Sequence, residues 1–137
     1  MDQVTVLLLV IAAAAAFGLW RRWDDGRTKR VKSDTALGVA EIGAELGESA
    51  TLLQFSSAFC APCRQAKAVL SRTAENVPGV VHVELDAESH LELVRQLGVM
   101  RTPTTLLLDS NGEVRNRVAG VPKQDLLLAA LADLKSE

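Results

Sequence analysis

Two cysteines, Cys60 and Cys63, are the residues of this 137-residue chain whose type and spacing most directly indicate chemistry, and the chain has no others. They stand where an apolar run gives way to the periodic pattern of a helix. The first turn of a helix exposes unpaired N–H groups and a partial positive charge, which favour a thiolate over a thiol at Cys60. Because the thiolate is the form that attacks disulfides, we predict that Cys60 is a nucleophile and that Cys63, one turn later, resolves its adducts.

Other roles for the cysteine pair agree less well with the sequence. A zinc site needs two further ligands, and the two histidines, His82 and His90, stand eight residues apart, which does not match the usual finger spacing. A permanent structural disulfide across so short a loop would constrain little of the unfolded chain. The sequence has no Ser-His-Asp set, P-loop or dinucleotide fingerprint, so we expect neither a metal nor a cofactor.

Hydrophobic periodicity predicts a strand before the cysteines and a helix after them. The run 52–55 places apolar side chains on both faces, as in a central strand. In the helix that follows, one face is shared by Ala66, Val69, Leu70 and Thr73. Upstream, residues 37–47 indicate a weak helix or an irregular segment that ends at Gly47.

Strand and helix patterns alternate in the rest of the chain. Residues 80–86 alternate apolar and polar side chains, which predicts a strand. Ser89 and Glu92 form a capping box for a helix whose inward face consists of Leu91, Val94 and Leu97. Residues 104–109 and 113–119 are predicted strands joined by the hairpin turn Asn111-Gly112. Pro122 opens a last helix, with an apolar stripe formed by Leu127, Ala130, Leu131 and Leu134.

The order of elements defines the fold class. Helices between strands imply parallel pairing, while the Asn-Gly turn requires one antiparallel pair. The sequence therefore predicts a single α/β domain with a mixed β-sheet and helices on both faces. An apolar share of 48% against 23% charged residues agrees with a folded domain rather than a disordered chain.

The N-terminal segment, residues 4–20, is apolar and has no charged side chain. As a helix rising about 1.5 Å per residue it reaches about 26 Å, slightly less than the roughly 30 Å of bilayer hydrocarbon. Trp20 and Trp23 can lie among the headgroups while the arginines between them extend outward. We predict one transmembrane anchor over residues 1–23, which contacts membrane lipid through residues 4–23.

A cleaved signal peptide and a buried helix of a globular domain are the alternatives for this segment. The three residues before the apolar run, Met-Asp-Gln, carry no Lys or Arg, which argues against a signal peptide. Six basic residues follow between Trp20 and Lys32. The positive-inside rule then predicts a single-pass protein of the cell membrane with its C-terminal domain in the cytoplasm. The extracytoplasmic orientation is the alternative.

Charge is distributed unevenly along the chain. Residues 24–35 are polar and charged without a hydrophobic period, which predicts a basic linker before a domain over residues 36–137. From Ser33 onward, fourteen acidic residues outnumber nine basic ones. An acidic domain on a basic stalk does not suit nucleic acid, so we expect no nucleic-acid partner. The stalk instead suits an anionic membrane surface.

Taken together, these residues give a chain that resembles the thioredoxin superfamily. The resemblance covers about residues 36–135 and rests on the order of elements, the Phe-Cys-Ala-Pro-Cys motif and the segment Arg101-Thr102-Pro103 before a strand. It implies that Pro103 follows a cis peptide bond and faces the cysteines, and that Thr102 offers backbone hydrogen bonds to an extended client. The client groove that the resemblance implies consists of Phe59, Ala61, Pro62, Thr102 and Pro103.

Three positions depart from the usual thioredoxin pattern. Phe59 stands where a Trp usually precedes the first cysteine, and Ala61 stands where a Gly is usual. Gln54, six residues before Cys60, replaces the buried Asp that usually accepts the proton of the second cysteine. An amide has no such ionisable group, so we expect Cys63 to be activated more slowly near neutral pH.

The resemblance implies a membrane-anchored thiol-disulfide oxidoreductase. Its partners would be the disulfides of client proteins and an electron donor that the sequence does not identify. Reduction of clients is the expected direction if the domain is cytoplasmic, because thiols are kept reduced there. A membrane-tethered redox-sensing or partner-binding module without turnover is the alternative function.

Overall fold

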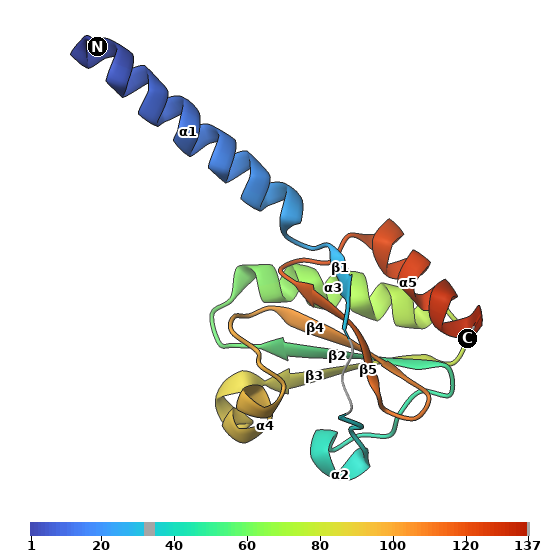
Figure 1. Ribbon diagram of the computed structural model, residues 1–137. Coiled ribbons are helices and arrows are strands. Elements are labelled where there is room, and N and C mark those ends of the chain that lie inside the picture. The colour runs from blue at the N-terminus through green and yellow to red at the C-terminus, as the bar shows by residue number, and fades with distance from the viewer. Residues whose placement is uncertain (32–34, 137) are drawn as a thin grey trace.

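The computed structural model describes residues 1–31 and 35–136 of the chain. It contains one long N-terminal helix and a domain in which a five-stranded sheet lies between helices (Figure 1). The elements are α1 Gln3–Asp24, β1 Thr28–Arg30, α2 Val39–Ile42, β2 Ala50–Ser56, α3 Ala61–Asn76, β3 Val80–Asp86, the 3-10 turn η1 Ala87–Ser89, α4 Leu91–Gln96, β4 Thr104–Asp109, β5 Val114–Ala119 and α5 Gln124–Ser136.

The sheet is mixed, as predicted, with the strand order β1-β5-β4-β2-β3. β2 and β3 are parallel because α3 carries the chain back between them. β4 is antiparallel to β2 and to β5, and the turn between β4 and β5 contains the predicted Asn111-Gly112 pair. β2 therefore has a neighbour on each side and lies inside the sheet.

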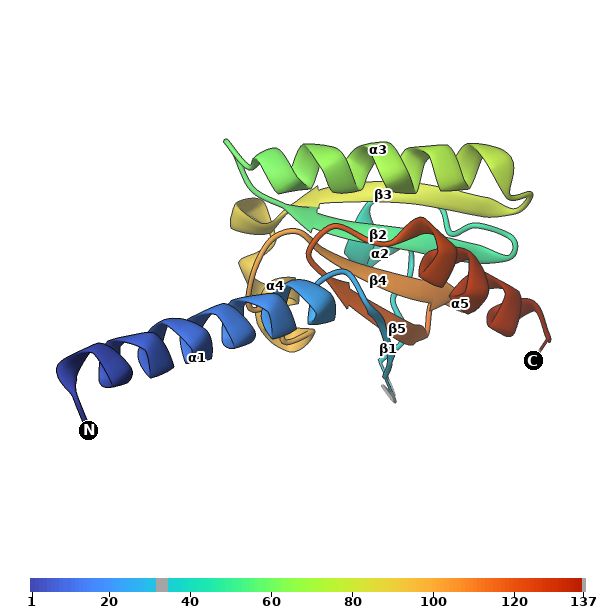
Figure 2. The same ribbon diagram turned by 90° about the horizontal axis from the view of Figure 1, so that it is seen from above.

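Helices cover both faces of the sheet, which confirms the predicted fold class. α3 and α5 lie on one face and α2 and α4 on the other (Figures 1 and 2). Successive residues of β2 point to opposite faces. Leu52 joins a cluster with Leu70 of α3 and Leu127 of α5, whereas Leu53 and Phe55 join the cluster beneath α2 and α4. Both faces of β2 are thus buried, in agreement with the apolar side chains that the sequence places on both faces at Leu52, Leu53 and Phe55.

Local side-chain contacts change two of the predicted helix ends. α2 ends at Ile42, and Gly43 takes the left-handed C-cap conformation that was assigned to Gly47. The predicted capping box at Ser89 is wrong because its hydroxyl donates to the carboxylate of Asp86, which also accepts the N–H of residue 88 and forms η1. α4 accordingly begins at Leu91, whose side chain is 58% exposed, and Leu93 is buried instead.

The segment predicted to be a linker contributes a strand to the sheet. Residues 28–30 form β1, which pairs antiparallel with β5 in the register Thr28↔Val118. Its polar side chains suit an edge strand that is exposed to water, so hydrophobic periodicity could not reveal it. Residues 32–34 of the predicted linker lie outside the described residues, and the domain boundaries at 23 and 35 stay predictions.

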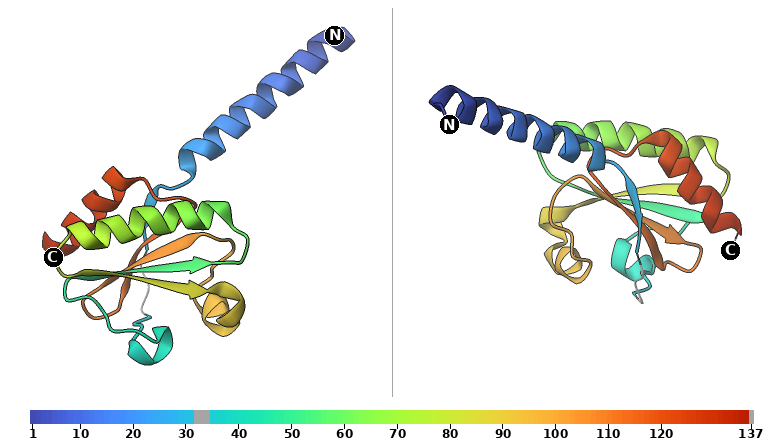
Figure 3. Two further views of the ribbon diagram at one scale, coloured as in Figure 1. Left: turned by 180° about the vertical axis from the view of Figure 1, so that it is seen from behind. Right: turned by 45° about the horizontal axis from the view of Figure 1, so that its top comes forward.

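The N-terminal helix projects away from the domain (Figure 3). α1 has 22 residues, none of which is buried, and is the one helix among the described residues that is long and apolar enough to span a membrane. At about 1.5 Å per residue it is about 33 Å long, close to the hydrocarbon thickness of a bilayer. Length and composition therefore make α1 a candidate membrane span.

The pairing of β1 with β5 can be tested at Val31, whose N–H donates to the carbonyl of Arg115 at 2.9 Å. We expect Val31→Pro, which removes this donor, to lower the free energy of unfolding by about 1 kcal/mol more than Val31→Ala. Urea unfolding of a fragment that begins at Asp24 measures the difference. Equal effects of the two substitutions would show that this end of β1 does not pair with β5 in solution.

Candidate active site

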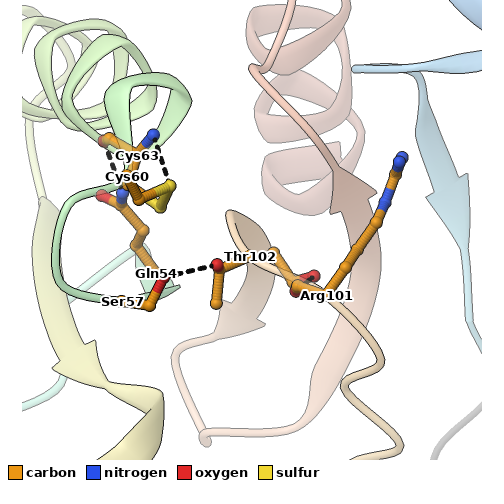
Figure 4. The surroundings of a disulfide bond; sticks show 7 residues. Gln54, Ser57, Cys60, Cys63, Arg101 and Thr102 are labelled. Carbon is orange, nitrogen blue, oxygen red and sulfur yellow. Dashed lines mark hydrogen bonds between the residues drawn. A yellow bond between two sulfur atoms is a disulfide. The ribbon is translucent and has the colours of Figure 1, made fainter.

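The pairing of β2 with β4 brings two separate loops together at one end of the sheet. Cys60 follows the end of β2, and the segment 101–103 precedes the start of β4. Because these strands are antiparallel, with Phe55 opposite Thr104, the two loops are neighbours. The hydroxyl groups of Ser57 and Thr102 are 2.9 Å apart and link the loops directly (Figure 4).

The two cysteines are joined by a disulfide at the N-terminus of α3 (Figure 4). Cys60 is the N-cap residue, and the backbone N–H of Cys63 donates to its Sγ at 3.2 Å. Cys63 is only 3% exposed, whereas Cys60 is partly exposed. A client can therefore approach the Cys60 sulfur, and the helix N-terminus stabilises negative charge on that sulfur once the disulfide is reduced.

Exposed groups surround the Cys60 sulfur. Ala61 and Pro62 form the first exposed positions of α3, where Pro62 lacks an N–H that would have no helical partner. Phe59 is fully exposed and has a φ of 58°, a left-handed conformation that is uncommon for a bulky residue. An open pocket of about 200 Å³ is lined by Ser56, Ser57, Phe59, Cys60, Cys63, Arg64, Lys67 and Glu84.

The peptide bond between Thr102 and Pro103 is cis, as the resemblance implied. Pro103 is buried, and its carbonyl accepts the N–H of Gly120 at 2.9 Å, which holds the loop against the end of β5. Within the described part of the chain, the backbone N–H and C=O of Thr102 have no hydrogen-bond partner. These groups are available to an extended client, and their role in client binding stays a prediction.

Gln54 lies buried between β2 and α3 and contacts the second cysteine through its backbone. Its Nε2 donates to the carbonyl of Cys63 at 2.9 Å, so its Oε1 faces the other way and accepts from Nε2 of His82 at 2.9 Å. With this assignment, Nδ1 of His82 accepts the hydroxyl of Ser71 at 3.2 Å. A continuous chain of hydrogen bonds therefore runs from α3 through β3 and β2 to Cys63.

The surroundings of His82 favour its neutral form. Burial lowers the pKa of His82 below its ordinary value of 6.5, the carboxylate of Glu84 opposes this change, and the ammonium of Lys67 adds to it. The hydrogen bond to Oε1 of Gln54 requires a proton on Nε2, and a neutral imidazole with that proton leaves Nδ1 free to accept the hydroxyl of Ser71. The chain from His82 to Cys63 is thus uncharged near neutral pH.

Glu84 is the acidic side chain that lines the pocket beside Cys63. It stands opposite Gln54 in the parallel pairing of β2 and β3, and its Oε1 lies 3.4 Å from Nζ of Lys67. The sequence alone did not place Glu84 at the site, and it offered His82 only as a zinc ligand. The signal that identifies both is the period of two in β3, which places them on the same face of the sheet as Gln54.

The structure brings together every residue that the sequence assigned to the site. Cys60 and Cys63 lie at the N-terminus of α3, Gln54 lies beneath Cys63, and the Thr102–Pro103 loop stands beside them. No group of three or more His, Cys, Asp or Glu side chains that could hold a metal occurs among the described residues. The arrangement can exchange a disulfide between the cysteine pair and a bound client.

Comparison with known proteins agrees with this arrangement. The family model for thioredoxin matches residues 40–133. Thioredoxin H5 of rice (Oryza sativa subsp. japonica) is 35% identical over 77 residues, which are 56% of this chain and 56% of the rice protein. A thioredoxin of Alicyclobacillus acidocaldarius is 33% identical over 89 residues, which are 64% of this chain and 84% of the relative. The chain thus matches little more than half of the rice protein and most of the bacterial one.

Solved structures show the same architecture. Thioredoxin f from spinach chloroplasts superposes with a TM-score of 0.59 at 26% identity and covers 82% of this chain and 96% of the spinach chain. A mutant thioredoxin from Halobacterium salinarum has a TM-score of 0.58 at 24% identity, covers 64% of this chain and 75% of its own, and supports the fold alone. Since the family model covers more than half of the chain and includes both cysteines, the protein belongs to the thioredoxin family.

Proposed function

We propose that this protein is a membrane-anchored thiol-disulfide oxidoreductase that reduces the disulfides of client proteins with the dithiol of Cys60 and Cys63. The observation that carries the proposal is the position of the pair. Cys60 caps α3 with a donor from the backbone of Cys63 on its sulfur, and the sulfur of Cys63 is within bonding distance. Membership of the thioredoxin family supports the same chemistry.

The reaction proceeds by two exchanges. The thiolate of Cys60 attacks one sulfur of the client disulfide, a mixed disulfide forms, and the other client sulfur leaves as a thiolate. The thiol of Cys63 then loses its proton and attacks the Cys60 sulfur, which forms the disulfide of this structure and releases the second client sulfur. Two electrons pass to the client, and a separate donor must reduce the pair before the next cycle.

The second exchange requires a group that accepts the proton of Cys63. Gln54 occupies the buried position beside Cys63, and its amide cannot serve because it is not ionisable and both of its polar atoms are already hydrogen-bonded. Glu84 lines the same pocket as Cys63 and is held there by Lys67. We assign the acceptor role to Glu84, at the surface of the pocket rather than beneath it.

The anchor completes the proposal. α1 has the length and composition of a single membrane span, with Trp20 and Trp23 exposed near its end and Arg21 and Arg22 in its last turn. The excess of basic residues after α1 supports a cytoplasmic orientation of the catalytic domain, and the opposite orientation is the alternative. Labelling of the reduced Cys60 thiol in intact cells by a membrane-impermeant reagent distinguishes the two orientations.

Reduction of insulin in the presence of dithiothreitol tests the catalytic proposal. We expect Cys60→Ser to lower the rate to that of dithiothreitol alone, because the attacking sulfur is lost. Cys63→Ser should leave the attack intact and accumulate a mixed disulfide with the client, which a non-reducing gel detects. A wild-type rate that does not depend on Cys60 would instead favour a redox-sensing module without turnover.

Replacement of Gln54 tests the supply of a proton acceptor. We expect Gln54→Asp to accelerate client release near neutral pH by about tenfold or more, since it adds a general base beside Cys63. Gln54→Asn is the matched control, because Asn has the same length as Asp but no ionisable group. Glu84→Gln should slow release in the wild-type background. Stopped-flow kinetics measure the release of the client from the mixed disulfide. Equal release rates for Gln54→Asp and Gln54→Asn would show that a proton acceptor at position 54 does not accelerate the reaction.

The lowered pKa of His82 predicts how stability depends on pH. Between the pKa of the folded state and the ordinary value of 6.5, the unfolded chain binds a proton on this imidazole more readily than the folded chain, so stability falls as the pH falls through this range. We expect His82→Gln to reduce that fall in urea unfolding of the oxidised protein at pH 8 and at pH 5. His90→Gln is the matched control at the other histidine. An unchanged pH dependence in His82→Gln would contradict the prediction.

A further inference from the structure

The anchor and the cysteines are at the same end of the sheet. β1 is antiparallel to β5, β5 to β4, and β4 to β2, so β1 and β2 run in opposite directions. The start of β1, which the chain enters from α1, therefore lies at the end of β2, where Cys60 follows. We call this the active-site end of the sheet. Figure 2 shows α1 leaving the domain on the side to which β2 points.

The lateral separation of the anchor and the active site is small. One row of paired residues crosses the sheet from Thr28 through Val118 and Thr105 to Gln54. Three strand spacings separate β1 from β2, which correspond to about 14 Å. In a domain of this size the anchor could join the sheet at the opposite end, but the direction of β1 excludes that arrangement.

Direct contacts hold the junction between α1 and the domain. Asp25 Oδ1 lies 2.6 Å from Nη2 of Arg101, the residue that precedes the Thr102–Pro103 loop. The N–H of Gly26 donates to the carbonyl of Ala119 at 2.8 Å. Gly26 has a φ of 78°, and the carbonyl of Val121 occupies the space that a Cβ would need, so this position requires glycine. An exposed ion pair alone would stabilise the junction little. The backbone hydrogen bond of Gly26 adds to it and defines where α1 leaves the sheet.

The active-site end also carries exposed apolar side chains. Phe59 lies in the loop after β2. Leu91 and Met100 lie between β3 and β4, because β3 ends and β4 begins at this end of the sheet. Leu91 is 58% and Met100 92% exposed. With Trp20 and Trp23 at headgroup level, only residues 25–27 separate the end of α1 from β1. If α1 spans the bilayer, the Cys60 sulfur and these apolar side chains would lie toward the membrane surface.

From this geometry we infer that the clients are disulfides of integral membrane proteins, held close to the headgroups, and not disulfides of freely soluble proteins. The inference rests on the proposed function and uses the same two exchanges at Cys60 and Cys63. The short, tied junction keeps the Cys60 sulfur at a nearly constant height above the bilayer, and a disulfide at that height has a high effective concentration. Phe59 and Met100 would contact the apolar end of a client's membrane span.

The test uses the full chain, reduced in advance, in lipid nanodiscs with a synthetic transmembrane peptide as the probe. The probe carries a fluorophore joined through a disulfide at both of its ends, so its orientation does not matter. In one form the disulfide is about three residues from the membrane span, and in the other it follows about 25 residues of flexible Gly-Ser linker. We expect the near disulfide to be reduced about tenfold faster than the far one.

Two insertion variants show whether the junction causes the preference. Twelve Gly-Ser residues inserted between Asp25 and Gly26 release the domain from α1, and we expect the near and far probes then to be reduced at similar rates. The same insert between Asp2 and Gln3 adds equal length at the other end of α1 and should keep the preference. Reduction of soluble insulin is measured with all three forms.

The outcomes separate the inference from the proposed function. If Cys60-dependent reduction of insulin or of a probe occurs but the native chain reduces near and far probes equally, the inference is overturned and the proposed function stands. If the variant with the insert after Asp25 keeps the near preference, the junction is not its cause and the inference is likewise overturned. If no form reduces insulin or either probe in a Cys60-dependent manner, the proposed function itself fails.

Discussion

The antiparallel pairing of β2 with β4 is the constraint on which the site depends. It sets Phe55 opposite Thr104, and thereby places the loop of Cys60 beside the loop of Thr102 and Pro103, more than 40 residues later in the chain. Each loop supplies a different part of the site. The cysteine loop supplies the sulfur and the helix N-terminus, and the proline loop supplies the backbone groups of Thr102, which have no hydrogen-bond partner among the described residues.

The chain of hydrogen bonds beneath the cysteines shows how the protein accommodates the buried polar side chain of Gln54. An amide buried without partners would cost several kcal/mol on the scale of transfer from water to an apolar solvent. Gln54 avoids that cost because Cys63 and His82 satisfy both ends of its amide. The contact to Cys63 is to its carbonyl and not to its sulfur. Gln54 therefore holds the backbone of the second cysteine in place, and the proton acceptor that we propose is a group of the open pocket.

The edge strand β1 gives the N-terminal segment a structural role beyond that of a tether. Its pairing with β5 continues the sheet, and the bonds of Asp25 and Gly26 connect it to the Thr102–Pro103 loop and to the end of β5. A flexible linker would let the domain take any orientation relative to a membrane. A strand at this position instead couples the orientation of the active site to the direction of α1.

The sequence by itself determined the order of the strands and α-helices from β2 to α5, the redox pair and the apolar N-terminal helix. These features depend on local pattern: period two in residues 80–86, period 3.6 in α3, the turn residues Asn111 and Gly112, and a spacing of three between the cysteines. Even there, the ends of α2 and α4 were wrong, because the carboxylate of Asp86 and the left-handed Gly43 compete with the expected caps.

Only the tertiary structure decided which residues meet. The strand β1 has no hydrophobic signal because an edge strand is solvated, so its pairing becomes visible only beside β5. The contacts of Gln54 with His82 and of Asp25 with Arg101 join residues 28 and 76 positions apart, and no local pattern encodes such distances. Local periodicity specifies what each segment becomes. The partners of the buried amide and the end of the sheet from which α1 leaves depend on how the strands pair.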